Sequence, residues 1–171
     1  MTGPLVLGAS SRVGQMLHRL WAQGALDFGG VPVWQYRADA SGQADHKIIW
    51  DILDGSVPDI THSGVICLAG PTAGPDLGLN RDLALAAAAV AQGAPLLYAS
   101  TQAVYGPQSG VLTELAACHP GAYGAAKLDA EAGLRACVCS PFGQRTDRGP
   151  GVEPRTAGVN GYGGYAKRCR A

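Results

Sequence analysis

The sequence predicts an α/β fold in which a parallel β-sheet is covered by helices on both faces. Two observations support this prediction. Short apolar segments rich in Val, Ile and Leu alternate with longer segments whose apolar residues recur at helical spacing. The first apolar segment also runs into a turn of small residues and then into a helical segment, within residues 4–14. Strands and helices that alternate in this way form three layers around one core.

The individual elements follow from the apolar pattern and from the residues that interrupt it. Strands are expected at five short apolar segments, bounded by glycine, proline or polar residues: 4–7, 31–36, 47–50, 64–69 and 95–99. Helices are expected at the segments with helical spacing or high Ala and Leu content: 12–24, 76–92 and 121–134. Residues 136–138 are expected to begin a sixth strand.

Composition limits the classes of protein to consider. The chain has 171 residues, 47% of them hydrophobic, and a formal net charge of zero. These values suit one domain with a sizeable core, and the lack of net positive charge argues against nucleic acid as a partner. No apolar stretch approaches the ~20 residues of a membrane span, and the first strand begins too early to leave room for a secretory signal. We therefore expect a cytoplasmic protein without a nucleic-acid or membrane partner.

Five cysteines are scattered along the chain without the spacing of a zinc site. The closest pair is Cys137 and Cys139, and metal binding there is the less favoured alternative. Free thiols in a reducing compartment are the expectation, and no metal site is predicted.

The turn after the first strand has the pattern of a phosphate-binding loop. Gly8 permits a tight turn, Gly14 allows the following helix to pack closely, and the unpaired N–H groups at the start of that helix face an anion. The pyrophosphate of a dinucleotide is the expected anion, contacted by residues Gly8, Ser10, Ser11, Arg12, Val13 and Gly14. Ser11 stands at the middle position of the three-glycine pattern, where its Cβ narrows the approach to phosphate. A plain strand–turn–helix is the alternative interpretation.

The end of the second strand bears on the choice of cofactor. In dinucleotide-binding folds an acidic residue there accepts a hydrogen bond from the ribose 2′-hydroxyl of NAD, whereas an arginine pairs with the 2′-phosphate of NADP. This strand ends at Arg37, and the first acidic residue after it is Asp39. NADP is therefore slightly favoured over NAD. An exposed arginine without a ligand is the alternative.

Tyr123 and Lys127 are four residues apart on a predicted helix, so they share one face. An ammonium group near the phenol stabilises the phenolate form that a general base needs. The preceding strand ends in two hydroxyl residues, Ser100 and Thr101, which can hydrogen-bond the reacting oxygen of a substrate. A surface tyrosine, a solvated lysine and a turn hydroxyl are the alternatives for the three residues taken singly.

These motifs together resemble the extended short-chain dehydrogenase/reductase family, in particular its NAD-dependent epimerase/dehydratase group. Residues 98–106 (YASTQAVYG) resemble the family strand that ends in Ser-Ser/Thr and continues to Val-Tyr-Gly. Residues 122–131 (AYGAAKLDAE) resemble the family helix with Tyr-Gly-x-Ser-Lys and a later Glu. The resemblance covers residues 4–138 and implies a three-layer Rossmann-like domain that binds NADP or NAD.

The resemblance also implies roles for individual residues. Thr101, Tyr123 and Lys127 would be catalytic, and Lys127 would in addition bind the nicotinamide ribose. Asp51 and Ile52 would contact adenine, and Asn80 would be a structural asparagine. The remaining cofactor contacts would come from a loop beside the dinucleotide: Leu68, Ala69 and Gly70. The expected substrate is a small molecule, a nucleotide sugar whose hydroxyl or carbonyl group is epimerised, dehydrated or reduced.

The composition changes abruptly near the end of the chain. Residues 135–171 contain no Leu, Ile or Met, and are rich in Gly, Arg and Pro. Such a segment buries too little apolar surface to offset its ordering entropy, so residues 139–171 are predicted to be a poorly ordered tail. RNA binding by this tail is a minor alternative, and a shifted reading frame or a truncated gene is a hypothesis for its origin.

Residues 1–138 would then form the dinucleotide-binding domain of a C-terminally truncated family member that lacks the substrate domain. Without that domain no substrate lid would form, and catalysis is expected to be negligible even with Thr101, Tyr123 and Lys127 in place. A non-catalytic NAD(P)-binding module is the alternative function.

Overall fold

The computed structural model describes residues 1–37, 46–113 and 115–139. Five strands form one sheet with the spatial order β3-β2-β1-β4-β5, and every neighbouring pair is parallel. The strands are β1 (Thr2–Leu7), β2 (Val31–Tyr36), β3 (Lys47–Ile49), β4 (Val65–Cys67) and β5 (Leu96–Tyr98). The predicted parallel sheet is therefore confirmed, with all five expected strands in place.

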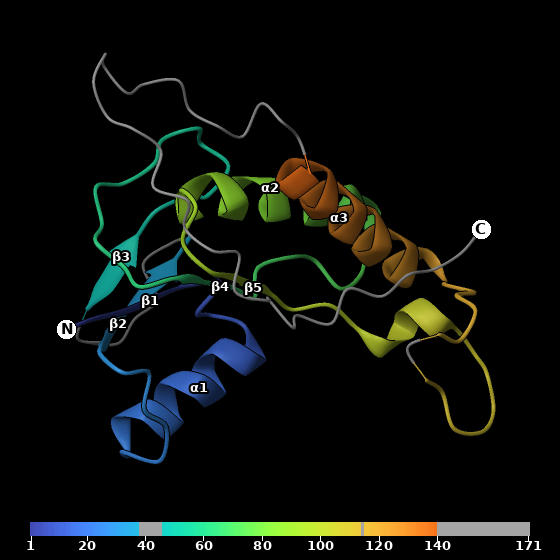
Figure 1. Cartoon of the computed structure of the whole chain (residues 1–171), viewed down its shortest axis with the longest axis horizontal. Helices are drawn as coiled ribbons and strands as arrows, with labels where there is room; N and C mark the ends of the chain where they lie inside the picture. Colours follow the sequence, from blue (N-terminus) through green and yellow to red (C-terminus); the bar gives the residue numbers. More distant parts are fainter. Residues whose placement is uncertain (38–45, 114, 140–171) are drawn as a thin grey trace, which may run out of the picture.

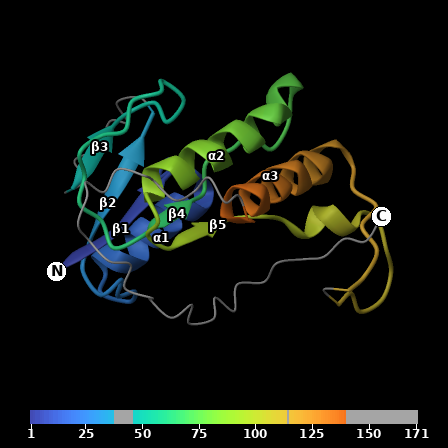
Figure 2. The ribbon, with the colours of Figure 1, turned by 45° about the horizontal axis from the view of Figure 1, so that its top comes forward.

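Helices cover both faces of this sheet, which confirms the three-layer, Rossmann-like architecture. Helix α1 (Arg12–Ala22) lies on one face, and helices α2 (Leu79–Ala91) and α3 (Ala122–Cys139) lie together on the other (Figure 1). Figure 2 shows α2 and α3 side by side. Two short 3₁₀ helices, η1 (Pro75–Gly78) and η2 (Gln102–Tyr105), precede α2 and follow β5.

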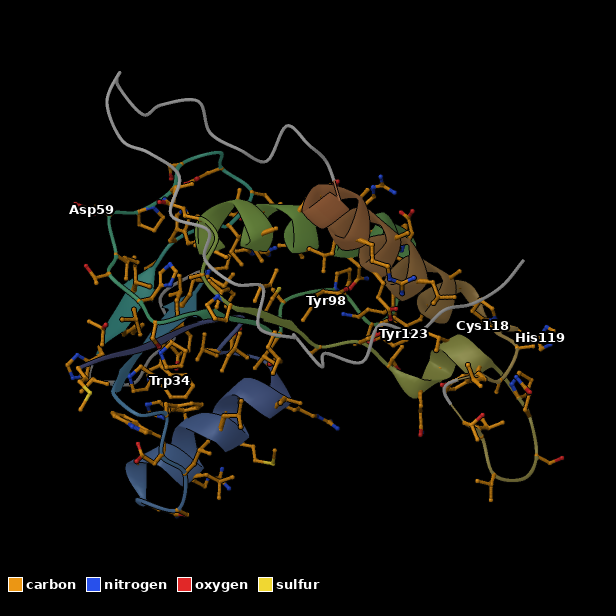
Figure 3. The ribbon with its side chains drawn as sticks, viewed as in Figure 1. Trp34, Asp59, Tyr98, Cys118, His119 and Tyr123 are labelled. Carbon is orange, nitrogen blue, oxygen red and sulfur yellow. The ribbon has the colours of Figure 1, made fainter. Side chains whose placement is uncertain are left out.

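The alternating side chains of the strands divide the core into two clusters. Leu5 and Leu7 of β1 pack on the side of α2, whereas Val6 between them packs on the side of α1. On the α1 side Trp34 is completely buried, and its ring centroid lies 4.7 Å from that of His18. Figure 3 shows Trp34 between the sheet and α1. Each face of the sheet thus has its own apolar contact with a helix.

The end of α3 corrects one prediction. Residues 136–138 were expected to begin a sixth strand, but they belong to α3, which continues to Cys139. Neither glycine nor proline occurs between Leu134 and Cys139, so nothing in the backbone interrupts the i→i−4 hydrogen bonds there. The rest of the predicted tail, from residue 140, lies outside the described residues, and so does Asp39.

The cysteines are not all free thiols. Cys67 is a buried free thiol and Cys137 an exposed one. Cys118 is paired in a disulfide, so the expectation of free thiols is wrong for this residue; sequence spacing alone does not show which cysteines the fold brings together. In the part of the chain that the structure describes, no three His, Cys, Asp or Glu residues are grouped so as to hold a metal ion.

No helix among the described residues is both long enough and apolar enough to span a bilayer.

Candidate functional site

The predicted site residues lie at the carboxyl edge of the sheet. Because all five strands are parallel, the residues that follow each strand emerge at the same edge. The chain leaves β1 toward β2 and β3 on one side and crosses to β4 and β5 on the other, so the order reverses between β1 and β4. In open α/β sheets this reversal opens a crevice where ligands bind. Gly8, Ala69 and Thr101 follow three strands at this edge.

Two glycines of the turn after β1 are required by close backbone contacts. Gly8 has a φ of 79°, and a Cβ on it would lie 2.7 Å from the backbone nitrogen of Ala69. A Cβ on Gly14 would lie 2.6 Å from the carbonyl oxygen of Ala9. The turn is therefore packed directly against the loop after β4 and against its own helix, as a phosphate-binding turn must be.

Ser11, at the position of the middle glycine, caps helix α1. Its backbone is extended, with φ −65° and ψ 159°, so the position does not demand glycine for conformational reasons. Its hydroxyl oxygen accepts a hydrogen bond from the backbone N–H of Gly14 at 3.0 Å. The N–H groups of Arg12 and Val13, in the first turn, have no acceptor within the helix, and no acidic residue occupies that turn. The start of α1 therefore suits a pyrophosphate.

Gln35 is a part of this region that sequence reasoning missed. It lies on β2 with only 2% of its surface exposed, and its side-chain oxygen accepts a hydrogen bond from the Gly8 N–H at 2.9 Å. Its side-chain nitrogen donates to the carbonyl oxygen of Trp50. The signal in the sequence is a polar amide within an otherwise apolar strand, where a buried polar group needs partners.

The residues predicted to bind the adenosine end of the dinucleotide differ in how far they are exposed to solvent. Arg37 is exposed directly after β2. Asp51 is also exposed, and its carboxylate accepts a hydrogen bond from the N–H of Leu53 at 3.1 Å. Ile52 is 6% exposed and packs in the core on the α2 side. Of the predicted adenine pair, only Asp51 presents its side chain to solvent.

Gly70 lies against two buried polar side chains. A Cβ on Gly70 would lie 2.2 Å from Oδ1 of Asn80 and 3.4 Å from Nζ of Lys127. Asn80 is completely buried, and its amide nitrogen donates to the carbonyl oxygens of Pro71 at 3.0 Å and Leu77 at 2.9 Å. These two hydrogen bonds tie Asn80 to the loop after β4.

The side chain of Lys127 is buried inside the protein. The residue is 4% exposed, and its ammonium donates to the carbonyl oxygen of Ala99 at 3.1 Å. The Nζ atom lies 4.7 Å from the ring centroid of Tyr98 and 5.9 Å from that of Tyr123. Burial lowers the pKa of Lys127, and the nearby Cys67 and Glu131 oppose this shift. A lysine so placed is not the solvated surface charge of the alternative interpretation.

Thr101 and Tyr123 lie on two elements that pack against each other. Thr101 is the N-cap residue of η2. Its hydroxyl oxygen accepts a hydrogen bond from the N–H of Ala103 at 3.2 Å, which leaves the hydroxyl proton available. Tyr123 is at the start of α3, where the next residue, Gly124, meets the carbonyl of Ala103: a Cβ there would be 2.4 Å from that oxygen. Figure 3 shows Tyr123 and Tyr98 on the side of the sheet that carries α3.

Ser100, the other hydroxyl after β5, is engaged elsewhere. Its hydroxyl donates to the carboxylate of Glu131, which also pairs with Arg135 at 2.7 Å. Of the two hydroxyl residues, Thr101 is therefore the one available for a substrate oxygen.

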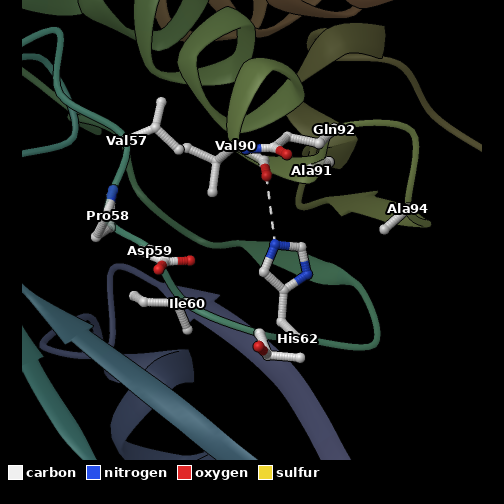
Figure 4. Close-up of a pocket in the computed structure, with 10 residues that line it drawn as sticks. Val57, Pro58, Asp59, Ile60, His62, Val90, Ala91, Gln92 and Ala94 are labelled. Carbon is white, nitrogen blue, oxygen red and sulfur yellow. Dashed lines mark hydrogen bonds between the residues drawn. The ribbon is translucent and has the colours of Figure 1, made fainter. Parts of the chain in front are cut away.

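A cavity of about 400 Å³ lies at the opposite edge of the sheet (Figure 4). It is lined by the segment before β4, by the end of α2 and by Ala94, which precedes β5. Nε2 of His62 lies 3.3 Å from the carbonyl oxygen of Val90. Since these residues belong to the amino ends of the strands, the cavity is separate from the predicted site.

Solved structures with a similar fold include nucleotide-sugar epimerases. The chain is similar to UDP-glucose 4-epimerase from Brucella ovis in complex with NAD, with a TM-score of 0.64 and 21% identity over 81% of this chain and 49% of that one. It is similar to a short-chain dehydrogenase/reductase superfamily protein from Agrobacterium tumefaciens with bound NAD, with a TM-score of 0.59 and 24% identity over 80% and 45% of the two chains. For UDP-glucuronic acid 4-epimerase from Bacillus cereus in complex with NAD, the TM-score is 0.60 and the identity 22%, over 77% and 51%.

The chain therefore shares its Rossmann-like fold with these solved structures, which include a short-chain dehydrogenase/reductase superfamily protein and two nucleotide-sugar 4-epimerases. The chain spans about half the length of these structures. No protein-family model matches the sequence. No curated protein matches it significantly either.

Proposed function

We propose that this chain binds a nicotinamide dinucleotide along the carboxyl edge of the sheet and acts on a hydroxyl or carbonyl group of a nucleotide sugar. The observation that supports this most directly is the buried ammonium of Lys127, which lies beside Tyr123 and is bonded to the end of β5. A phenol paired with a buried cation at the ligand-binding edge of an α/β sheet is an arrangement for proton transfer.

The residues at this edge fit the cofactor. Gly8 and Gly14 leave no room for a Cβ, so the backbone of the turn is as compact as a pyrophosphate site requires. The free N–H groups at the start of α1 would bind the pyrophosphate, together with Ser10 and Ser11. Asp51 would lie at the adenine end, and the loop of Leu68, Ala69 and Gly70 would run beside the dinucleotide.

Three residues of the chain would then act on the substrate. Tyr123 would take the proton of the substrate hydroxyl as the carbon is oxidised, and return it on reduction. Lys127 would stabilise the phenolate and hydrogen-bond the nicotinamide ribose, while the free hydroxyl proton of Thr101 would orient the substrate oxygen. The nicotinamide ring, when bound, accepts or returns a hydride.

The preference for NADP over NAD rests on Arg37 alone. Its exposed position after β2 is suited to a 2′-phosphate, and no acidic residue precedes it on that strand. The similar structures from Brucella ovis, Agrobacterium tumefaciens and Bacillus cereus contain NAD. We therefore propose a nicotinamide dinucleotide as the cofactor. Arg37 would be the residue that favours NADP over NAD by pairing with the 2′-phosphate.

A non-catalytic dinucleotide-binding module is the second candidate. It rests on the turn after β1 alone, where Gly8 and Gly14 leave no room for a Cβ. The presence of Thr101, Tyr123 and Lys127 favours the enzyme, since a module that only binds needs none of the three.

Calorimetric titration with NADH and NADPH, followed by an assay of UDP-glucose and UDP-glucuronic acid turnover, tests both candidates. Binding with turnover supports the enzyme. Binding without turnover of either sugar supports the module, and absence of binding contradicts both.

A further inference from the structure

The side-chain amide of Gln35 is a buried polar group on β2, an interior strand of the sheet. The residue is 2% exposed, although it lies on β2 between Trp34 and Tyr36, which pack against the apolar core on the α1 side. Successive side chains of a strand point to opposite faces, so the Gln35 amide lies on the α2 side, where the buried residues are also apolar. Burying an amide there is costly unless both its oxygen and its nitrogen find partners. Both partners here belong to the backbone at the carboxyl edge of the sheet.

Gln35 connects three strand ends through hydrogen bonds. Its side-chain oxygen accepts from the N–H of Gly8 at 2.9 Å, and its side-chain nitrogen donates to the carbonyl of Trp50. Its main-chain oxygen accepts from the N–H of Ala9 at 3.0 Å. Two consecutive N–H groups of the turn after β1 are thus held by one residue of β2, which is also tied to the residue before Asp51.

We propose that Gln35 is a positioning residue for the dinucleotide: it fixes the phosphate-binding turn relative to the adenine end of the site. This rests on the function proposed above. With the Gly8 N–H held by Gln35, the turn cannot rotate to satisfy that donor elsewhere, and the start of α1 stays directed at the pyrophosphate. The bond to Trp50 sets the distance from this turn to Asp51.

The pattern of partners specifies an amide. Gly8 offers a donor and Trp50 an acceptor, so the residue between them must accept on one atom and donate on the other. A methionine cannot donate, and its thioether sulfur is only a weak acceptor. A glutamate can do both only when it is protonated, because an ionised carboxylate has no hydrogen to give to the Trp50 carbonyl and adds negative charge beside the pyrophosphate.

The substitution Gln35→Glu converts this requirement into a pH dependence. We expect binding of ADP-ribose, measured by calorimetry, to be about tenfold weaker than in the unmodified protein at pH 8, as follows from losing one hydrogen bond and adding charge. At pH 5.5 the affinity should return to within about threefold of the unmodified protein, because protonation restores both bonds. Gln35→Met should be weakened equally at both pH values.

Gln23→Glu is the matched control, because Gln23 is exposed and lies at the other end of α1. Gln23→Glu adds the same charge and should leave the affinity for ADP-ribose unchanged at pH 8 and at pH 5.5. Hydrogen exchange of the Gly8 amide, compared with that of Leu5, needs no ligand and should be faster by about tenfold in Gln35→Met, as follows from losing the acceptor of that amide.

The possible outcomes separate the two proposals. If the unmodified protein binds ADP-ribose but Gln35→Glu binds it equally well at pH 8, or follows the same pH dependence, the role of Gln35 is wrong and the proposed function stands. Unchanged Gly8 exchange in Gln35→Met also overturns that role. Failure of the unmodified protein to bind ADP-ribose overturns the proposed function itself.

Discussion

The ammonium nitrogen of Lys127 lies 3.1 Å from the carbonyl oxygen of Ala99, and this bond joins α3 to the end of β5. A lysine with 4% exposure has little freedom to leave such a partner. Tyr123 precedes it by one helical turn and therefore lies on the same face of α3. The position of the phenol relative to the carboxyl edge of the sheet is thus set by a buried contact.

Replacing Tyr123 by phenylalanine is expected to abolish most turnover while the fold persists. The substitution keeps the ring that faces Lys127 and removes only the hydroxyl that would transfer the proton. Loss of a general base typically costs about 10²–10⁴-fold in rate. Turnover of the nucleotide-sugar substrate, measured with saturating cofactor, checks this expectation, and cofactor affinity should remain unchanged.

Tyr98→Phe provides a matched control for this experiment. Its hydroxyl is buried without a hydrogen-bond partner among the described residues, and its ring lies 4.7 Å from the same Lys127 nitrogen. Removing that hydroxyl should leave turnover within about twofold, because no bond is lost. Equal turnover in Tyr123→Phe and Tyr98→Phe would remove Tyr123 from the catalytic site.

Ser11→Gly is expected to tighten dinucleotide binding. The change removes the Cβ that narrows the approach to phosphate and releases the Gly14 N–H, which the Ser11 hydroxyl now occupies. One more N–H available to the pyrophosphate should improve the affinity for ADP-ribose by about three- to tenfold. Because glycine is an acceptable N-cap, stability should fall by only about 0.3 kcal/mol.

Ser11→Ala separates the two effects in calorimetric titrations. It also releases the Gly14 N–H but keeps the Cβ, and it costs about 1 kcal/mol of stability through loss of the cap. A smaller gain in affinity than in Ser11→Gly is expected. Identical affinities in the original protein and both variants would show that the start of α1 does not bind the pyrophosphate.

Arg37→Asp is expected to shift cofactor preference from NADPH toward NADH. The arginine would otherwise pair with the 2′-phosphate, and an aspartate repels that group but accepts from a 2′-hydroxyl. Loss of one charge-assisted contact should change the ratio of the two dissociation constants by at least about tenfold. Arg19→Asp, which makes the same charge change at an exposed position in the last turn of α1, should leave the ratio unaltered. An unchanged ratio in Arg37→Asp would exclude Arg37 from the site.

The parallel sheet was predictable because each strand is a short apolar run bounded by turn residues. The prediction used only the residues of each short run, and this also explains the error at residues 136–138. Cys137 and Val138 suit a strand by composition, but a helix with no interrupting residue simply continues through them. The end of a helix depends on what it packs against, which a local pattern does not contain.

The candidate site was partly predictable for a different reason. The end of each parallel strand must lie at one edge, so the turn after β1 and the hydroxyls after β5 could be placed from the strand order alone. Other contacts join residues that are distant in sequence. Ser100 donates a hydrogen bond to Glu131, and Gln35 accepts one from Gly8. Such hydrogen-bond partners are brought together by the packing of the fold, and no fixed spacing in the sequence predicts them.

The buried thiol of Cys67 is expected to make the stability of the protein depend on pH in the alkaline range. It is the last residue of β4, it is completely buried, and burial raises the pKa of its thiol from 9.0 to about 11. The hydrogen bond involving the backbone of Ala69 and the charge of Lys127 oppose this rise. The thiol therefore stays protonated in the folded protein at pH values where the unfolded chain already releases its proton.

Stability should consequently fall as the pH rises from 9 toward 11, where the folded protein binds more protons than the unfolded chain. A difference of about two pH units corresponds to a loss of about 3 kcal/mol in the free energy of unfolding, with the full contribution present below pH 9. Urea denaturation of Cys67→Ala should show a flatter decline over this interval, despite a lower stability at pH 7 from the lost packing. Cys137→Ala removes an exposed thiol and should decline in parallel with the original protein. If Cys67→Ala also runs parallel to the original protein between pH 9 and 11, the buried thiol does not control the alkaline limit.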